Sequence, residues 1–336
     1  MGASMTVVIS PKTPAAKPTA SKHSNRVKLI ALIAVFFMLS YQLVSVDINY
    51  FQYAMQIRAP KLIAIIFAAF CIGTATIVFQ STINNRIVTP CLLGMNALYI
   101  LIHTSIAFVF GATHDFSADR NISFIIDLVL MSVVSTFLYS YLFKKTNYNI
   151  LFVLLCGTVM ATLFQSISDT MLRILDPNEY DVLLESLVAG FDEVNGDILA
   201  LAAFLIVAVA LVFRKDIYLL DVITLGKEQA INLGVDYDKT VQRLLIGITL
   251  YITIATALVG PISFLGLIIA NVAREFLNTY RNIYLMLASF LLGVIVLLFG
   301  QILIEHLFEF STVISVFINV LGGVYFLYLV LRSRGI

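Results

Sequence analysis

The histidines, cysteines and acidic residues of this sequence are spaced too widely to form a catalytic site. The histidines stand alone at His23, His103, His114 and His306, and neither they nor the three cysteines show the spacing of metal ligands. No Ser–His–Asp set, HExxH pair or glycine-rich phosphate loop can be assembled from the chain. We therefore expect no enzyme, no cofactor or metal on this chain, and no ATP hydrolysis by it.

One carboxylate, Asp127, lies inside a long apolar window, and ion-driven transport would need ionisable groups near the middle of the membrane. Because Asp127 stands close to the start of its window, we expect it near the outer interface, as a snorkelling or capping side chain. His103 also lies within an apolar window, where we expect a hydrogen-bonded structural histidine rather than a substrate ligand. A single peripheral carboxylate is poor machinery for proton coupling, so the energy for transport must come from elsewhere.

A short polar stretch between two apolar windows, LGKEQAINLG at residues 225–234, carries the strongest functional signal. We expect about two helical turns from Lys227 to Leu233, with Gly226 and Gly234 marking the two ends. A compact helix of this kind can seat in a cleft of a soluble partner and pass rigid-body motion to the helices behind it. Taken alone, an ordinary amphipathic loop explains the stretch equally well.

The composition indicates what kind of element must position these residues. Of the 336 residues 60% are hydrophobic and 12% charged, and the mean hydropathy is +0.97, far more apolar than a soluble domain. About ten windows are long and apolar enough to cross a bilayer, and their continuous runs exclude barrel strands, which predicts an all-α polytopic membrane protein. The windows are residues 29–46, 61–81, 93–111, 122–143, 149–168, 197–213, 241–259, 262–274, 283–304 and 312–331.

The distribution of positive charge orients these windows. If ten spans follow a cytoplasmic tail, both termini lie in the cytoplasm and most cationic residues fall in inner loops. The outer cations are then four of the 21 lysines and arginines, namely Arg58, Lys61, Arg120 and Arg173. We expect residues 1–26 to be a disordered tail and residues 27–336 to form one membrane domain. The longest outer connection, residues 169–196, has the apolar spacing of a short amphipathic helix.

Two further stretches carry recognisable motifs, RAPKLIAIIFAAFCIGTATIVFQSTINNRIVTPCLLGMNALY at residues 58–99 and GPISFLGLIIANVAREF at residues 260–276. Together with the 225–234 stretch they resemble the bacterial ABC importer permeases for iron–siderophores and vitamin B12. The second stretch departs from that family's signature at Ser263, and it has Ala270 and Asn271 where the family usually has Pro-His. The end of the first stretch looks closest to permeases for ferric catecholate or petrobactin-type siderophores.

The resemblance implies a permease of the type II ABC importer architecture in the bacterial cytoplasmic membrane, surrounded by membrane lipid. Its partners would be a second permease subunit, an ABC ATPase dimer that binds the ATP and Mg, and an extracytoplasmic siderophore-binding protein, with no nucleic acid. By position, the resemblance assigns ATPase coupling to Gly226, Glu228, Ala230, Leu233 and Gly234, binding-protein docking to Arg58 and Lys61, the cytoplasmic gate to Asn85 and Ile87, and the translocation path to Met160, Phe164 and Gln165. Between the two gate residues, Arg86 replaces a proline that is frequent in the family.

Other functions stay open on the sequence alone. The same fold could import cobalamin, haem or another metal chelate, since substrate choice resides largely in the binding protein. A secondary transporter is disfavoured by the missing intramembrane charges, and a membrane enzyme by the missing catalytic residues. Arg58 and Lys61 could instead anchor lipid headgroups, and the three path residues could be plain helix packing. The sequence does not decide between a homodimer and a heterodimer.

Overall fold

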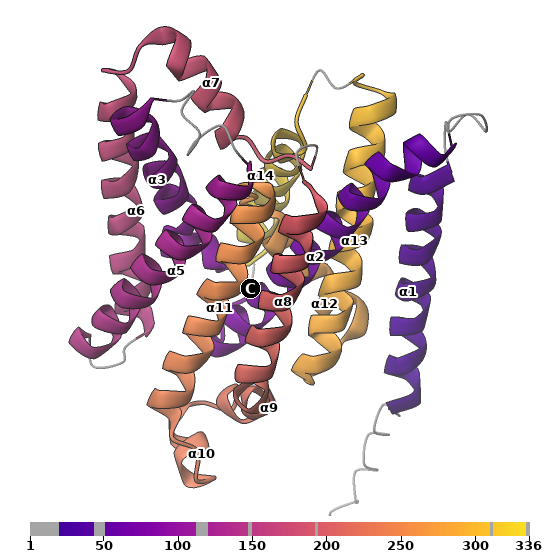
Figure 1. Ribbon diagram of the computed structural model, residues 1–336. Coiled ribbons are helices and arrows are strands. Elements are labelled where there is room, and N and C mark those ends of the chain that lie inside the picture. The colour runs from indigo at the N-terminus through magenta and orange to yellow at the C-terminus, as the bar shows by residue number, and fades with distance from the viewer. Residues whose placement is uncertain are drawn as a thin grey trace, which may run out of the picture.

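The computed structural model describes residues 20–43, 51–111, 120–146, 150–191, 194–309 and 312–333, and in these ranges the chain is a bundle of helices without strands (Figure 1). The elements are α1 (Ala20–Leu43), α2 (Phe51–Ile83), the 3-10 helix η2 (Pro90–Leu93), α3 (Met95–Phe110), α5 (Arg120–Lys145), α6 (Ile150–Leu172), α7 (Pro177–Leu187), α8 (Gly196–Val212), α9 (Arg214–Ile223), α10 (Lys227–Asn232), α11 (Tyr237–Val259), α12 (Leu265–Leu277), α13 (Asn282–His306) and α14 (Ile314–Ser333). The long helices run between two ends of the bundle, which we name the α7 end and the α10 end (Figure 1). The all-α prediction is confirmed.

Each predicted apolar window contains one of these helices. By length and composition, six described helices can cross a membrane, and α8 and α9 together make a seventh that bends by 54°. Helices α3 and α14 are shorter apolar helices, and α12 has only 13 residues. The count of ten complete crossings therefore stays a prediction. The amphipathic helix expected within residues 169–196 is present as α7.

Three features differ from the sequence prediction: the starts of two helices and the presence of a third. Helix α1 begins at Ala20, so residues 20–26 extend the first helix instead of belonging to the tail; residues 1–19 lie outside the described part. Helix α2 begins at Phe51 and runs through Pro60, because a proline removes only one backbone donor from an otherwise apolar helix. Helix α9 was not predicted, because it buries only one side and therefore lacks the continuous apolar run of a span.

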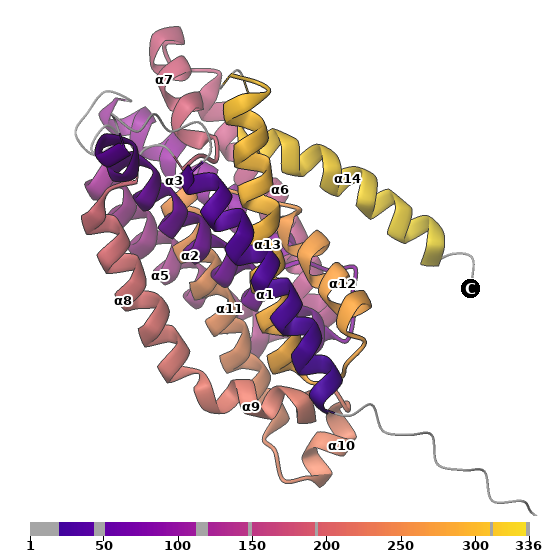
Figure 2. The ribbon, with the colours of Figure 1, turned by 90° about the vertical axis from the view of Figure 1, so that its right-hand side faces the viewer.

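Helix α2 forms the centre of the bundle, and all its residues from Cys71 to Thr82 are buried. It packs mainly against α11 and α13. Helices α1 and α12 cover α13, helix α5 covers α11, and α3 packs against α6. In Figure 2, α14 projects away from the other helices and packs mainly against α12 and α13.

Glycines allow the central helices to approach closely. A Cβ on Gly73 of α2 would lie 3.0 Å from the backbone nitrogen of Phe290 on α13. A Cβ on Gly293 of α13 would lie 3.1 Å from Ala69 Cβ, and one on Gly266 of α12 would collide with the Thr76 side chain. Because lipid supplies no hydrophobic force between helices, such close backbone contacts are a main source of their attraction.

Helices α3 and α12 begin inside the bundle rather than at its ends. Their 16 and 13 residues reach about 24 and 20 Å, less than the thickness of about 30 Å of the hydrocarbon layer. The 3-10 helix η2 and Gly94 precede α3, and a non-helical segment precedes α12. In the first turn of α3, Asn96 Nδ2 donates to Ser263 Oγ of that segment at 3.0 Å. The Cys91 thiol also lies 3.3 Å from the Ser263 carbonyl oxygen. Protein contacts thus satisfy polar groups that lipid would leave unpaired.

The close contact at Gly73 gives a stability prediction. Replacing Gly73 with alanine forces α2 and α13 apart, because the new Cβ meets backbone atoms that cannot rotate away. We expect Gly73→Ala to lower the free energy of unfolding by about 1–3 kcal/mol, measured by thermal or denaturant unfolding in detergent. Gly323→Ala on α14 is the matched control, because a Cβ there meets no atom within 4 Å. Equal stability of the two variants would contradict this packing argument.

Candidate functional site

Helix α10 forms the protrusion at the α10 end, beyond the ends of the long helices (Figures 1 and 2). It spans Lys227–Asn232, close to the bounds predicted from sequence. Gly226 precedes it with φ +101° and Gly234 follows it with φ +82°, values that favour glycine. Gly234 N–H donates to Ile231 O at 2.9 Å and Val235 N–H to Ala230 O at 3.0 Å, which is a Schellman ending.

The surface of α10 combines an anchored side with an exposed apolar side. Ala230 is completely buried, so it attaches the helix to the body of the protein and cannot touch a partner. Leu225, Ile231 and Leu233 are 57%, 53% and 62% exposed. Sequence reasoning included Leu233 among the coupling residues but missed Ile231, whose place beside the buried Ala230 could have indicated an outward-facing apolar residue. Exposed apolar side chains on a small protrusion are typical of a docking surface.

Ion pairs fix this protrusion to the neighbouring helices. Lys227 Nζ lies 2.8 Å from Asp238 Oδ1 at the start of α11, and Arg243 Nη2 lies 3.2 Å from the buried Asp216 on α9. Asp236 caps α11 and pairs with Lys239 at 2.7 Å; this side-chain hydrogen bond holds the pKa of Asp236 below its ordinary value. Helices α9, α10 and the start of α11 therefore form one connected unit.

The predicted gate residues lie in the loop between α2 and η2, also at the α10 end. Asn85 is exposed and Ile87 is half-buried, and Ile87 N–H donates to Asn85 Oδ1 at 3.0 Å. The carbonyl of Arg86 between them accepts two amide hydrogen bonds, from Gln80 Nε2 at 2.8 Å and from Asn271 Nδ2 at 3.0 Å. We name residues 84–89 the gate loop. Its main chain is held by side chains of α2 and α12.

Arg58 and Lys61, the predicted docking cations, lie in α2 on the side of the bundle away from α10. The Arg58 guanidinium donates to Tyr41 O at 2.9 Å and lies 5.5 Å from the centre of the Tyr41 ring. The Tyr41 hydroxyl donates to Glu305 Oε1 at 3.0 Å. Arg58 therefore ties α2 to α1, in addition to any docking role, which stays a prediction for both cations.

The predicted path residues on α6 face different surroundings. Phe164 turns toward α3 and α5, where it lines an apolar cavity of about 420 Å³ with Leu98 and Val134. Gln165 lines a different cavity of about 440 Å³, beside Asn96 and Ser263 at the meeting point of the interrupted helices. Met160 is half-buried. Of the three, Gln165 is the one beside both family motifs.

Helix α6 also carries an exposed polar stripe that sequence reasoning did not single out. The stripe follows helical spacing and consists of Thr158, Thr162, Ser166, Asp169, Thr170 and Arg173. Each hydroxyl donates to a carbonyl of its own helix, for example Thr162 Oγ1 to Val159 O at 2.7 Å, and Gln165 Nε2 donates to Asp169 Oδ1 at 2.8 Å. The sequence could have predicted this polar face, because hydroxyl residues recur every four positions along one apolar helix.

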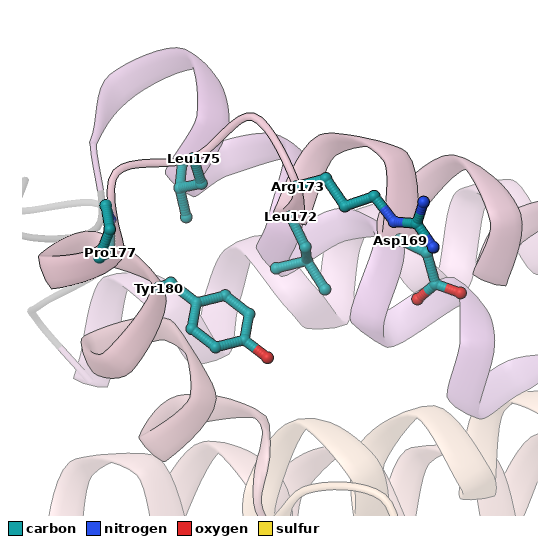
Figure 3. A pocket seen from close by; sticks show the side chains of 6 residues that line it. All are labelled: Asp169, Leu172, Arg173, Leu175, Pro177 and Tyr180. Atoms are coloured by element: carbon teal, nitrogen blue, oxygen red, sulfur yellow. The ribbon is translucent and has the colours of Figure 1, made fainter.

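The stripe ends at a further cavity, of about 480 Å³, at the α7 end. It lies between the last turn of α6 and the first turn of α7 (Figure 3). Asp169 and Arg173 stand together on one side of this cavity and Tyr180 of α7 points its hydroxyl into it from the other (Figure 3). Leu172, Leu175 and Pro177 supply the apolar part of the wall. This cavity lies at the end of the stripe, and the cavity beside Gln165 adjoins its middle, at Thr162.

His103 and Asp127 form a buried pair between α3 and α5. His103 Nε2 lies 2.8 Å from Asp127 Oδ2, with 6% and 3% of the two side chains exposed, and the Tyr99 ring lies 4.3 Å from the His103 ring. The hydrogen-bonded histidine is confirmed, whereas the snorkelling position of Asp127 is wrong, because the bundle encloses it. The pairing could have been inferred, since a carboxylate inside an apolar helix needs a polar partner on a neighbouring helix.

Comparison with known proteins matches nearly the whole chain. The family model described as the FecCD transport family matches residues 27–332. The petrobactin import system permease protein YclO of Bacillus subtilis (strain 168) is 41% identical over 310 residues, which cover 92% of this chain and 98% of YclO. The petrobactin import system permease protein FatC of Bacillus anthracis is 33% identical over 314 residues, covering 92% of this chain and 89% of FatC.

A solved structure has the same arrangement of helices. A chain of a metal-chelate type ABC transporter in an inward-facing conformation superposes with a TM-score of 0.79 at 17% identity. The match covers 92% of this chain and 99% of the solved one. The fold is therefore that of an ABC importer permease, as the sequence motifs predicted.

The buried His103–Asp127 pair gives a second prediction. Replacing either residue by leucine leaves the other polar group buried without its partner, and we expect a loss of about 2 kcal/mol in the free energy of unfolding. Replacing both removes the unpaired group, so the double variant should be more stable than the sum of the single effects indicates. Denaturant unfolding in detergent measures all three variants. Strictly additive losses would show that the pair does not couple α3 to α5.

Proposed function

Because this chain belongs to the FecCD transport family, we propose that it is the membrane permease subunit of an ATP-driven importer for ferric siderophores of the petrobactin type. The observation that carries the substrate class is the similarity, over more than nine-tenths of the chain, to two permeases named for petrobactin import. The chain's own residues support the transport role, since the sequence offers no catalytic set and the structure offers two cavities with polar side chains in their walls along an apolar bundle.

The energy source would be a partner ATPase that docks on α10. The chain has no phosphate-binding loop, so ATP and Mg would bind to the partner. Leu225, Ile231 and Leu233 provide an exposed apolar surface. The Lys227–Asp238 pair connects α10 to α11, and the Arg243–Asp216 pair connects α11 to α9. A force applied to α10 would therefore reach the long helices without loss in a flexible loop. We place this end in the cytoplasm, as the charge distribution predicts.

The path for the siderophore would follow the polar stripe of α6. A face of hydroxyls, Gln165 and Asp169 fits a water-filled passage better than lipid, and it links the cavity at the α7 end with the cavity at the interrupted helices. A second permease subunit would complete the passage by facing the same stripe. We place the siderophore-binding protein at the α7 end, where Arg173 and Tyr180 line the entrance.

Alternating access would then be a rigid-body change. ATP binding draws the two ATPases together, the α10 helices of the two permeases follow, and the helices around α6 change their tilt. The gate loop lies at the α10 end, so it would close or open the passage on the cytoplasmic side. Substrate and nucleotide thus act at opposite ends of one bundle.

Reconstitution tests the proposal directly. The permease, its ATPase, its second permease and its lipid-anchored binding protein are placed in liposomes with ferric petrobactin and with cobalamin as a competing cargo. We expect ATP-dependent accumulation of the ferric siderophore and none of cobalamin. Accumulation that runs on a proton or sodium gradient without ATP would overturn the proposed function, and ATP-driven uptake of cobalamin alone would overturn the substrate class.

The exposed side of α10 gives a fourth prediction. Changing both Ile231 and Leu233 to aspartate replaces apolar contact surface by charge, so ATPase binding should weaken by at least about 30-fold, the loss expected for an interface hot spot. Co-purification and titration with the ATPase measure the effect. Asn232→Asp on the same helix is the control, since it adds charge to an exposed polar position and should leave binding nearly unchanged. Unchanged binding in the double variant would remove the docking assignment.

A further inference from the structure

A continuous chain of side-chain hydrogen bonds connects α9, next to the ATPase-docking helix, with the gate loop. We propose that this chain transmits the displacement of α10 to the gate loop, so that its members are positioning residues for transport. The inference rests on the proposed function. We name the chain the Asp221 relay. Its members are Asp221 of α9, Asn282 of α13, Ser81 and Gln80 of α2, and Arg274 and Asn271 of α12.

The relay begins where Asp221 caps helix α13 from another part of the chain. Asp221 Oδ1 accepts from the backbone N–H of Asn282 at 3.0 Å and from its side-chain Nδ2 at 2.7 Å. No side chain of α13's own N-cap residue makes a capping bond. A carboxylate at this position is favoured by the unpaired N–H groups and the dipole of the helix. The first turn of α13 is therefore bonded to α9.

The middle of the relay crosses from α13 to α2 and on to α12. Ser81 Oγ donates to Asn282 Oδ1 at 2.6 Å and accepts from Arg274 Nη2 at 2.9 Å. Arg274 Nε donates to Gln80 Oε1 at 3.3 Å. Gln80, Ser81 and Asn282 are all at most 4% exposed. Water cannot readily replace a lost partner at such depth. Breaking one of these hydrogen bonds therefore leaves a buried polar group unpaired, which costs free energy.

The last link reaches the gate loop. Gln80 Nε2 donates to Arg86 O, and Asn271 Nδ2 donates both to Arg86 O and, at 2.9 Å, to Leu267 O of its own helix. The main chain of the gate loop is thus held from two helices at one carbonyl. A shift of α12 relative to α2 must change at least one of these two bonds.

The placement of these hydrogen bonds suits the transmission of a movement from α10 to the gate loop better than a purely structural role. The turn after α9 is hydrogen-bonded, with Leu225 N–H donating to Val222 O and Gly226 N–H to Ile223 O, so α9 follows α10 as one body. Motion of α9 must then either carry the first turn of α13 through Asp221 or break the bonds to Asn282. The later links join α13 to α2, α2 to α12, and both α2 and α12 to the gate loop, so a displacement of any one of these helices must change a link of the relay.

A reciprocal exchange tests the relay in the reconstituted four-component transporter. Asn282→Asp places two carboxylates against each other, and we expect siderophore uptake per ATP hydrolysed to fall about tenfold, within the usual range for coupled sites. Adding Asp221→Asn to that variant again lets an amide donate to a carboxylate, so the double exchange should recover to within about twofold of the unmodified protein. Basal ATPase activity and complex assembly are measured in parallel, and neither should change.

A matched pair on α2 decides the question if Asn282→Asp fails to assemble. Ser81→Ala removes a hydroxyl of the relay, whereas Thr82→Val removes the neighbouring buried hydroxyl, which bonds only Val78 O of its own helix. Uncoupling in Ser81→Ala alone supports the relay. Equal uptake per ATP in both, or an assembled double exchange that stays uncoupled, overturns it. If the unmodified transporter shows no ATP-driven uptake, the proposed function has failed instead.

Discussion

The apolar surroundings of this bundle demand that every backbone N–H and C=O group finds a partner within the protein, and this constraint governs the whole architecture. Helices meet it along most of the described chain, and two of the breaks between α-helices, residues 84–94 and 260–264, lie against each other. There the chain leaves the helical path, and the two irregular segments satisfy each other through Asn96, Ser263 and Cys91. Because such segments are stable only against protein or a cavity, the cavity beside Gln165 and the gate loop lie where the helices are interrupted.

The same constraint separates the functional surfaces. Docking needs exposed apolar side chains in water, and the structure offers them on α10, outside the bundle. Passage of a polar cargo needs hydroxyls and amides within the bundle's span, and α6 offers them. The glycines of the central helices α2, α12 and α13 hold the intervening body tightly together. A compact body of this kind can tilt as a unit, whereas a loosely packed one would absorb the displacement locally.

Local sequence patterns predicted the features that local chemistry determines. Gly226 and Gly234 mark the ends of α10 because only glycine readily adopts their positive φ values, and the apolar windows indicate where helices must lie. Features that depend on packing between distant segments were not predictable in the same way. The His103–Asp127 pair, the capping of α13 by Asp221 and the bond from Arg58 to Tyr41 each join helices whose relative rotation no short stretch encodes. The different cavities that Phe164 and Gln165 line likewise depend on how α6 packs against α3.

Three of the four positions where this sequence departs from the family pattern, all except Ala270, take part in two contacts. Asn271, which stands where the family usually has histidine, donates to the carbonyl of Arg86, which stands where a proline is frequent. Ser263, the third departure, accepts from Asn96 and lies against Cys91. Both contacts lie where an irregular segment touches a short helix, so side-chain hydrogen bonds hold both irregular segments. A hydrogen bond can break and reform during a transport cycle, whereas a proline ring is fixed. The gate loop, for which we propose the gating role, is therefore held by contacts that a displacement of α12 against α2 can exchange.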